Sequence, residues 1–170
     1  MVHAIVIPRD GGGDLWIAEL AGLKDFQTVI GGWIEPIELD GSDTTLYANG
    51  GIQCSRGPFN SRATALYWYH GQHRNRPLIL GDVVLVGTDP GVTEAAEPRL
   101  IHGLLAHHEF VVQLCPDGLT WCDTSLRFPS WFSAALWAMV IDSTLPDSVG
   151  LRIEALDDCA ESPSEEMRSW

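Results

Sequence analysis

Short runs of apolar residues, several of them alternating with polar ones, predict β-strands along most of the chain. The run HAIVIP ends at a proline, and the glycine-rich turn RDGGGD separates it from the returning run LWIAEL. The strongest strand signal is ILGDVVLVG, which is rich in the β-branched residues that strands favour. These patterns predict a sheet in the first half of the chain.

The second half begins after a connector rich in Pro, Gly and acids, TDPGVTEAAEPR. The runs EFVVQL and LTWCDTS flank CPDG, a turn in which Pro116 presets φ and Gly118 tolerates a positive φ. LRIEAL alternates apolar and charged residues, as a half-exposed strand does. LIHGLLAHH fits either a short helix or a strand.

Three segments have the spacing or composition of helices. Leu23, Phe26 and Ile30 recur every three or four residues, and a Gly-Gly pair follows them as a stop signal. Asn60 is placed to cap the segment SRATALYWYHG. FPSWFSAALWAMVIDS is apolar nearly all round, so we expect this helix to be buried. We assign Trp16, Trp68, Trp121, Trp131 and Trp137 to the core.

The strand WIEPIEL carries the first candidate site residue. Its period of two places Glu35 on the same face as Trp33 and Ile37, where an inward carboxylate is a candidate acid, base or ligand-binding group. The alternative is a carboxylate that pairs with an arginine or points outward. Pro36 cannot donate to a ladder, so it predicts an edge strand or a bulge.

Together these elements predict an α+β fold. We expect a single compact domain with a mixed or antiparallel sheet, two or three helices and a C-terminal extension. Residues 1–90 form its α/β core, residues 91–156 are the extension packed on the same core, and residues 157–170 are an acidic tail expected to be mobile. A chain of 170 residues with 45% hydrophobic content can build such a core.

Charge narrows the classes of partner. The chain has 10 Lys and Arg against 23 Asp and Glu, a formal net charge of -13, which disfavours nonspecific binding of nucleic acid. Such a field steers a protein toward basic partners. The longest apolar block, Trp131–Ile141, is too short to cross a membrane, and no targeting leader is visible, so we expect a cytoplasmic protein.

The four cysteines predict no special chemistry. They are Cys54, Cys115, Cys122 and Cys159, which are scattered and lack the close spacing of zinc ligands. Cys54 lies near Arg56 and is a candidate nucleophile, but its surroundings match no nucleophile signature, so we interpret it as a loop cysteine. We predict reduced cysteines, no metal, no cofactor and no catalytic residue.

The segment from Gly50 to Pro77 holds no acid, although the chain is acidic. Within it Arg56 and Arg62 bracket Asn60, where the first N–H groups of the expected helix carry partial positive charge. This combination suits a phosphate, a carboxylate or a nucleotide. The alternative is an ordinary helix cap, with arginines that pair with acids elsewhere. In either case a surface arginine there is expected to add little to stability.

Four segments, GGWIEPIEL, LYANGG, GPFNSRAT and ILGDVVLVG, resemble in their order a family of small phage- and plasmid-borne proteins of unknown function. The resemblance covers about residues 1–90, and it departs from the family where NGG replaces an acidic turn and Ser61 separates Asn60 from Arg62. It implies a compact α/β domain from a mobile element, and no established chemistry.

Two function classes follow. The first is a non-catalytic accessory protein of a mobile genetic element that binds a host or element protein. The second is a protein, or a small enzyme, that binds an anion or a nucleotide at Arg56, Asn60 and Arg62, with Glu35 as a further candidate ligand-binding residue.

Overall fold

The computed structural model places the chain in two compact units, residues 1–106 and residues 107–170. The structure describes residues 1–50, 57–71, 77–87, 99–105, 109–146 and 148–156. Arg56, Cys54, Cys159 and the expected acidic tail lie outside the described residues.

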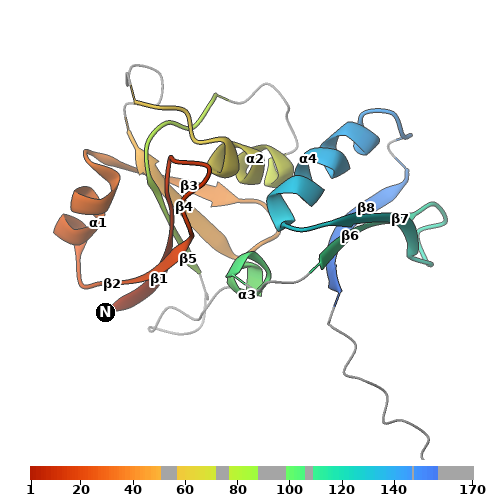
Figure 1. Cartoon of the computed structure of the whole chain (residues 1–170), viewed down its shortest axis with the longest axis horizontal. Coiled ribbons are helices and arrows are strands. Elements are labelled where there is room, and N and C mark those ends of the chain that lie inside the picture. Colours follow the sequence, from red (N-terminus) through yellow and green to blue (C-terminus); the bar gives the residue numbers. More distant parts are fainter. Residues whose placement is uncertain (51–56, 72–76, 88–98, 106–108, 147, 157–170) are drawn as a thin grey trace, which may run out of the picture. The chain divides into compact units, whose positions relative to one another are not determined.

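The first unit contains a five-stranded antiparallel sheet with the strand order β2-β1-β5-β4-β3 (Figure 1). Its strands are β1 (Val2–Ile7), β2 (Trp16–Leu20), β3 (Ile34–Leu39), β4 (Thr44–Asn49) and β5 (Val83–Gly87). Its helices are α1 (Leu23–Ile30), α2 (Ser61–His70) and α3 (Arg99–Leu105). The strand that contains Pro36 lies at an edge of the sheet, as predicted.

Helix α1 covers one face of this sheet. Phe26 meets Tyr47 of β4 edge to face, with ring centroids 5.1 Å apart, and Ile30 is buried. The helix ends at Gly31, whose φ of 76° is a conformation that glycine adopts readily. The apolar side of α1 packs against alternate residues of three strands: Ala4, Val6, Leu20, Val84 and Val86.

Helix α2 lies on the opposite side of the sheet from α1 (Figure 1). The strand residues that alternate with the α1 contacts, among them Ile5, Leu46 and Leu85, are fully buried. Ala63 and Leu66 of α2 are also fully buried. Because both faces are covered, residues 4–7 of β1 and all of β5 are buried, and they have the continuous apolar sequence that such strands require.

The second unit is a three-stranded antiparallel sheet, with the order β7-β6-β8, that contacts α4. Its elements are β6 (Glu109–Cys115), β7 (Cys122–Phe128), α4 (Trp131–Asp142) and β8 (Gly150–Leu156). Ser130 caps α4, because its hydroxyl oxygen accepts the Ser133 N–H at 3.2 Å. The buried residues of α4 are Trp131, Ala134, Ala135 and Ala138.

These elements confirm the α+β class and decide for antiparallel sheets. The described residues form four helices instead of two or three, because the ambiguous segment around residue 100 is helix α3. The two units meet at residue 106. The predicted core of residues 1–90 with an extension of residues 91–156 stays a prediction. That the C-terminal half shares a core with residues 1–90 stays a prediction. No helix of the described residues is long and apolar enough to span a membrane.

Candidate functional site

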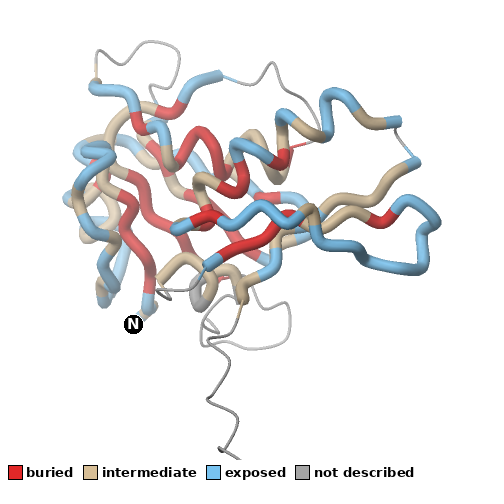
Figure 2. Tube along the Cα trace, turned by 45° about the vertical axis from the view of Figure 1, so that its right-hand side comes forward, coloured by how far each residue is buried: buried red, intermediate tan, exposed pale blue. Residues whose placement is uncertain are grey.

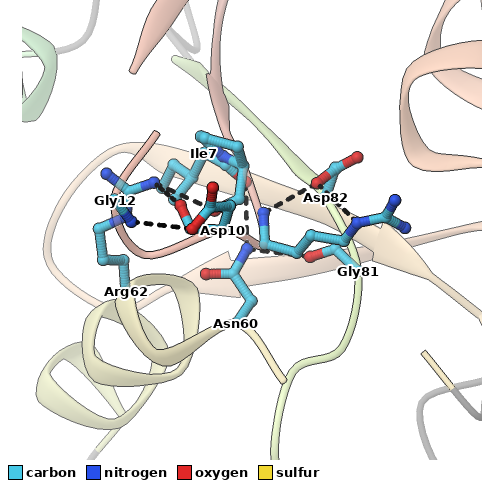
Figure 3. Close-up of polar contacts among 9 residues, drawn as sticks. Ile7, Asp10, Gly12, Asn60, Arg62, Gly81 and Asp82 are labelled. Carbon is cyan, nitrogen blue, oxygen red and sulfur yellow. Dashed lines mark hydrogen bonds and ion pairs between the residues drawn. The ribbon is translucent and has the colours of Figure 1, made fainter. Parts of the chain in front are cut away.

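Asn60 is the centre of a polar cluster at the start of α2. It is 1% exposed, and its side-chain oxygen accepts the Ala63 N–H at 3.0 Å, which confirms the predicted cap. Its amide nitrogen donates to the carbonyl oxygens of Ile7, at 3.1 Å, and Gly81, at 2.9 Å (Figure 3). One side chain therefore joins α2 to the end of β1 and to the segment before β5.

Arg62 extends the cluster to the turn between β1 and β2. Its guanidinium donates to the backbone carbonyls of Gly13, at 2.7 Å, Asp10, at 2.8 Å, and Pro8, at 3.1 Å. Figure 3 shows Arg62 beside Asp10. Burial lowers the pKa of Arg62, while the charges of Asp10 and Asp14 act in the opposite direction. The side chain is thus half-buried and bonded to its own chain, which corrects the expectation of a surface arginine. Its effect on stability stays a prediction.

The Gly81-Asp82 turn completes the cluster. Gly81 has a φ of 80°, which favours glycine, and its N–H donates to the Pro58 carbonyl at 2.9 Å. The Asp82 carboxylate accepts the Arg9 N–H at 2.8 Å and lies 4.0 Å from the Arg9 guanidinium (Figure 3). We call Asn60, Arg62, Gly81 and Asp82 the Asn60 cluster; it fixes the ends of three elements relative to one another.

The structure brings together only part of the predicted ligand set. Asn60 and Arg62 lie in one cluster, whereas Arg56 is outside the described residues. Glu35 is exposed on β3, so the interpretation of an inward carboxylate is wrong. The reason is its place on the edge strand, where Trp33 is 81% exposed and Leu39 alone of that face is buried. Anion binding at this helix end stays a prediction.

The described cysteines have structural surroundings. Cys115 is buried and Cys122 exposed, and Cys122 pairs across the hairpin with Leu114. Burial, followed by the nearby Asp117 charge, raises the pKa of the Cys115 thiol, which favours the unreactive protonated form. Backbone N–H groups of Thr120 and Leu119 hold the pKa of Asp117 at about 2. The part of the chain that is described contains no cluster of three metal-ligating side chains.

The assignment of five tryptophans to the core is wrong for three of them. Trp16 is 46% exposed, Trp121 38% and Trp137 51%, while Trp131 is buried and Trp68 is half-buried. The same error affects helix α4, which was expected to be buried all round. The outward side of this helix consists of Leu136, Trp137 and Val140, and we call these residues the α4 outer face. In Figure 2, buried and exposed segments alternate along this helix.

A family model for a domain of unknown function, DUF3846, matches residues 2–107. The chain belongs to the DUF3846 family. The match reaches beyond the first 90 residues, on which the resemblance was based, and takes in α3. Comparisons with curated proteins and with solved structures found no match.

The DUF3846 match contains only one of the two features described above. The Asn60 cluster lies inside it, and the α4 outer face lies in the segment after residue 107. The segments GPFNSRAT and ILGDVVLVG contribute the four members of the Asn60 cluster. No alternation of apolar and polar residues in α4 distinguishes its outer face, so the sequence offered no signal for it.

Proposed function

We propose that this DUF3846 protein is a non-catalytic accessory protein of a mobile genetic element and acts by binding a host or element protein. The resemblance to phage- and plasmid-borne proteins supports the origin, and the acidic charge of -13 supports a partner with basic surface. The main support for the binding role is the exposed α4 outer face.

The α4 outer face has the composition of a binding surface. Leu136, Trp137 and Val140 are 52%, 51% and 56% exposed, and Val140 lies four residues after Leu136 and three after Trp137, so the three share one side of the helix. The Trp137 ring lies against Phe128, with centroids 6.4 Å apart, so part of its rotational freedom is lost before any partner binds. Tryptophan is also one of the residues enriched at the energetic centre of protein interfaces.

The proposed function is tested by a pull-down with a matched pair of charge variants. Trp137→Glu places a charge in the α4 outer face, whereas Leu119→Glu places the same charge on a residue that is 87% exposed at the β6–β7 turn. Wild type and Leu119→Glu should capture the same proteins from a host lysate, and Trp137→Glu should lose them. A hot-spot tryptophan is worth about 2 kcal/mol or more, or about thirty-fold in affinity.

Thermal unfolding of all three proteins provides the control for folding. Similar melting temperatures show that a loss of capture reflects the surface and not the fold. If Trp137→Glu folds and still captures the same proteins as wild type, the α4 outer face does not carry the binding and the proposal fails in this form.

A further inference from the structure

The five-stranded sheet has two edges of different character. β2 and β3 each have one neighbouring strand among the described residues. β3 carries Pro36 and two exposed acids, Glu35 and Glu38, which are features that keep other strands away from an edge. β2 has the sequence WIAEL, without proline or glycine, and is therefore the edge that an additional strand would join.

The direction of the backbone groups follows from one hydrogen bond and the strand register. Gly50 N–H donates to the Trp33 carbonyl at 2.6 Å, so this pair at the end of β3 and β4 is a hydrogen-bonded pair. Such pairs alternate with non-hydrogen-bonded ones along an antiparallel ladder. Three residues further along, Pro36 opposite Tyr47 is therefore a non-hydrogen-bonded pair, and the proline nitrogen points to the open edge.

The alternation carries across the sheet to β2. The N–H and carbonyl of Tyr47 therefore point toward β5, where its partner is Val84. Successive residues of a strand direct these groups to opposite sides, so the N–H and carbonyl of Leu85 point toward β1. Leu85 pairs with Ile5, so the N–H and carbonyl of Ile5 point toward β5 and bond there. Ile17 of β2 lies opposite Ile5, so its own N–H and carbonyl point away from β1.

The same geometry holds two residues along, for Glu19 opposite His3. The outer edge of β2 thus presents two N–H groups and two carbonyls at the spacing of a strand, whereas the edge of β3 lacks a donor at Pro36. In the described part of the chain, no strand pairs with this side of β2.

The side chains at this edge select the partner. Ile17 is 54% exposed and Glu19 has a side chain that is 64% exposed, close to His3 on the neighbouring strand. Asp10 and Asp14 precede the strand in the β1–β2 turn. A second copy paired antiparallel about Ala18 would place Ile17 opposite Glu19, which offers the Glu19 carboxylate no cation, and it would bring together two chains that each carry a net charge of -13. A segment with Lys or Arg opposite Glu19 complements the edge.

We propose that the outer edge of β2 binds an extended, basic segment of a partner protein as a sixth strand, with backbone bonds to Ile17 and Glu19. This mode of recognition uses main-chain bonds for affinity and side chains for selection. The inference rests on the proposed function only in that the partner is a protein. Its variants leave the α4 outer face unchanged, so the two can fail separately.

The test uses a displayed library of random peptides of about eight residues, a length that covers a typical edge strand. Selection on the full-length protein should enrich peptides that contain Lys or Arg. Their affinity should fall at least about ten-fold, or 1.4 kcal/mol, for Ile17→Pro, which removes one outward N–H and leaves the β1–β2 bonds in place.

A charge swap makes the test independent of any effect of proline on folding. Selection on Glu19→Lys should enrich acidic peptides, whereas Glu38→Lys, the matched variant on β3, should select the same basic peptides as wild type. Amide hydrogen exchange of the free protein provides a second measurement, in which Ile17 and Glu19 should exchange faster than Ala18 and Trp16.

Four outcomes overturn the proposal. The first is protection of the Ile17 and Glu19 amides in the free monomer, and the second is a dimer that Ile17→Pro dissociates. The third is a library that gives no binders. The fourth is a set of binders with the same affinity for wild type, Ile17→Pro and Glu19→Lys. The first shows that the chain covers its own edge, and the second shows that a second copy covers it.

Discussion

The start of α2 and the outer side of α4 reverse the usual expectation for polar and apolar residues. At α2, an asparagine and an arginine turn inward and bond to backbone carbonyls from distant segments. At α4, a leucine, a tryptophan and a valine turn outward. The difference shows that residue type indicates what a side chain is able to do, while its surroundings decide whether it holds the fold together or contacts another molecule.

The largest expected effect separates the two sides of α4. Trp131 is 7% exposed, and Trp131→Ala should lower the free energy of unfolding by about 3–5 kcal/mol because it leaves a cavity. Trp137→Ala on the outer face should cost about 1 kcal/mol or less. Urea unfolding measures both. Equal losses would mean that the outer face is part of the core, and that α4 does not differ from α2 in turning apolar residues outward.

The next effect concerns the buried cap. Asn60→Ala removes the cap acceptor and both donors, and it leaves the carbonyls of Ile7 and Gly81 with one partner fewer. We expect a loss of about 2–4 kcal/mol, the sum of a cap and of poorly satisfied buried groups. Ser61→Ala, at the exposed neighbouring position, is the control and should stay within about 0.5 kcal/mol. Similar values for both variants would contradict a structural role for the Asn60 cluster.

A smaller loss is expected for the arginine of the same cluster. Arg62→Ala removes three hydrogen bonds from a charged donor to backbone carbonyls and should cost about 1–3 kcal/mol, measured by urea unfolding. Arg62→Lys should recover less than half of this loss, because an ammonium lacks the planar fork of the guanidinium. An unchanged unfolding midpoint for Arg62→Ala would show that these three hydrogen bonds do not stabilise the fold.

A variant of Val140 tests whether the α4 outer face serves binding and not stability. Val140 is 56% exposed, so Val140→Ser should change the free energy of unfolding by no more than about 0.5 kcal/mol. In the lysate experiment the same variant should capture measurably less of the partner than wild type does. A stable variant with unchanged capture would restrict the binding surface to Leu136 and Trp137.

The smallest expected effect tests the anion-site hypothesis. If the helix end binds anions, phosphate, sulfate or a nucleotide should raise the melting temperature of the wild type by a few degrees, in line with a weak ligand that binds only the folded state. Arg62→Ala should lose this shift. A thermal-shift screen with chloride at matched ionic strength measures it, and equal shifts in both proteins would remove Arg62 from the ligand set.

The sequence was sufficient for local structure. Periodicity and turn residues located α1, α2, α4 and most strands, because the spacing of apolar residues reflects which side of an element is covered. Asn60 was identified as a cap, since a capping residue and the N–H group it accepts are three residues apart. Pro36 was identified at an edge because proline cannot donate to a neighbouring strand.

The tertiary structure decided what these elements contact. The acceptors of Arg62 lie 49 to 54 residues before it, and no local pattern encodes such a distance. Helix α4 is apolar on all sides, so only its packing determines that Trp131 is covered and Trp137 is not. Likewise, the backbone direction at Ile17 depends on a register that runs through four neighbouring strands. Long-range packing fixes these properties because each depends on partners that the chain brings close only when it folds.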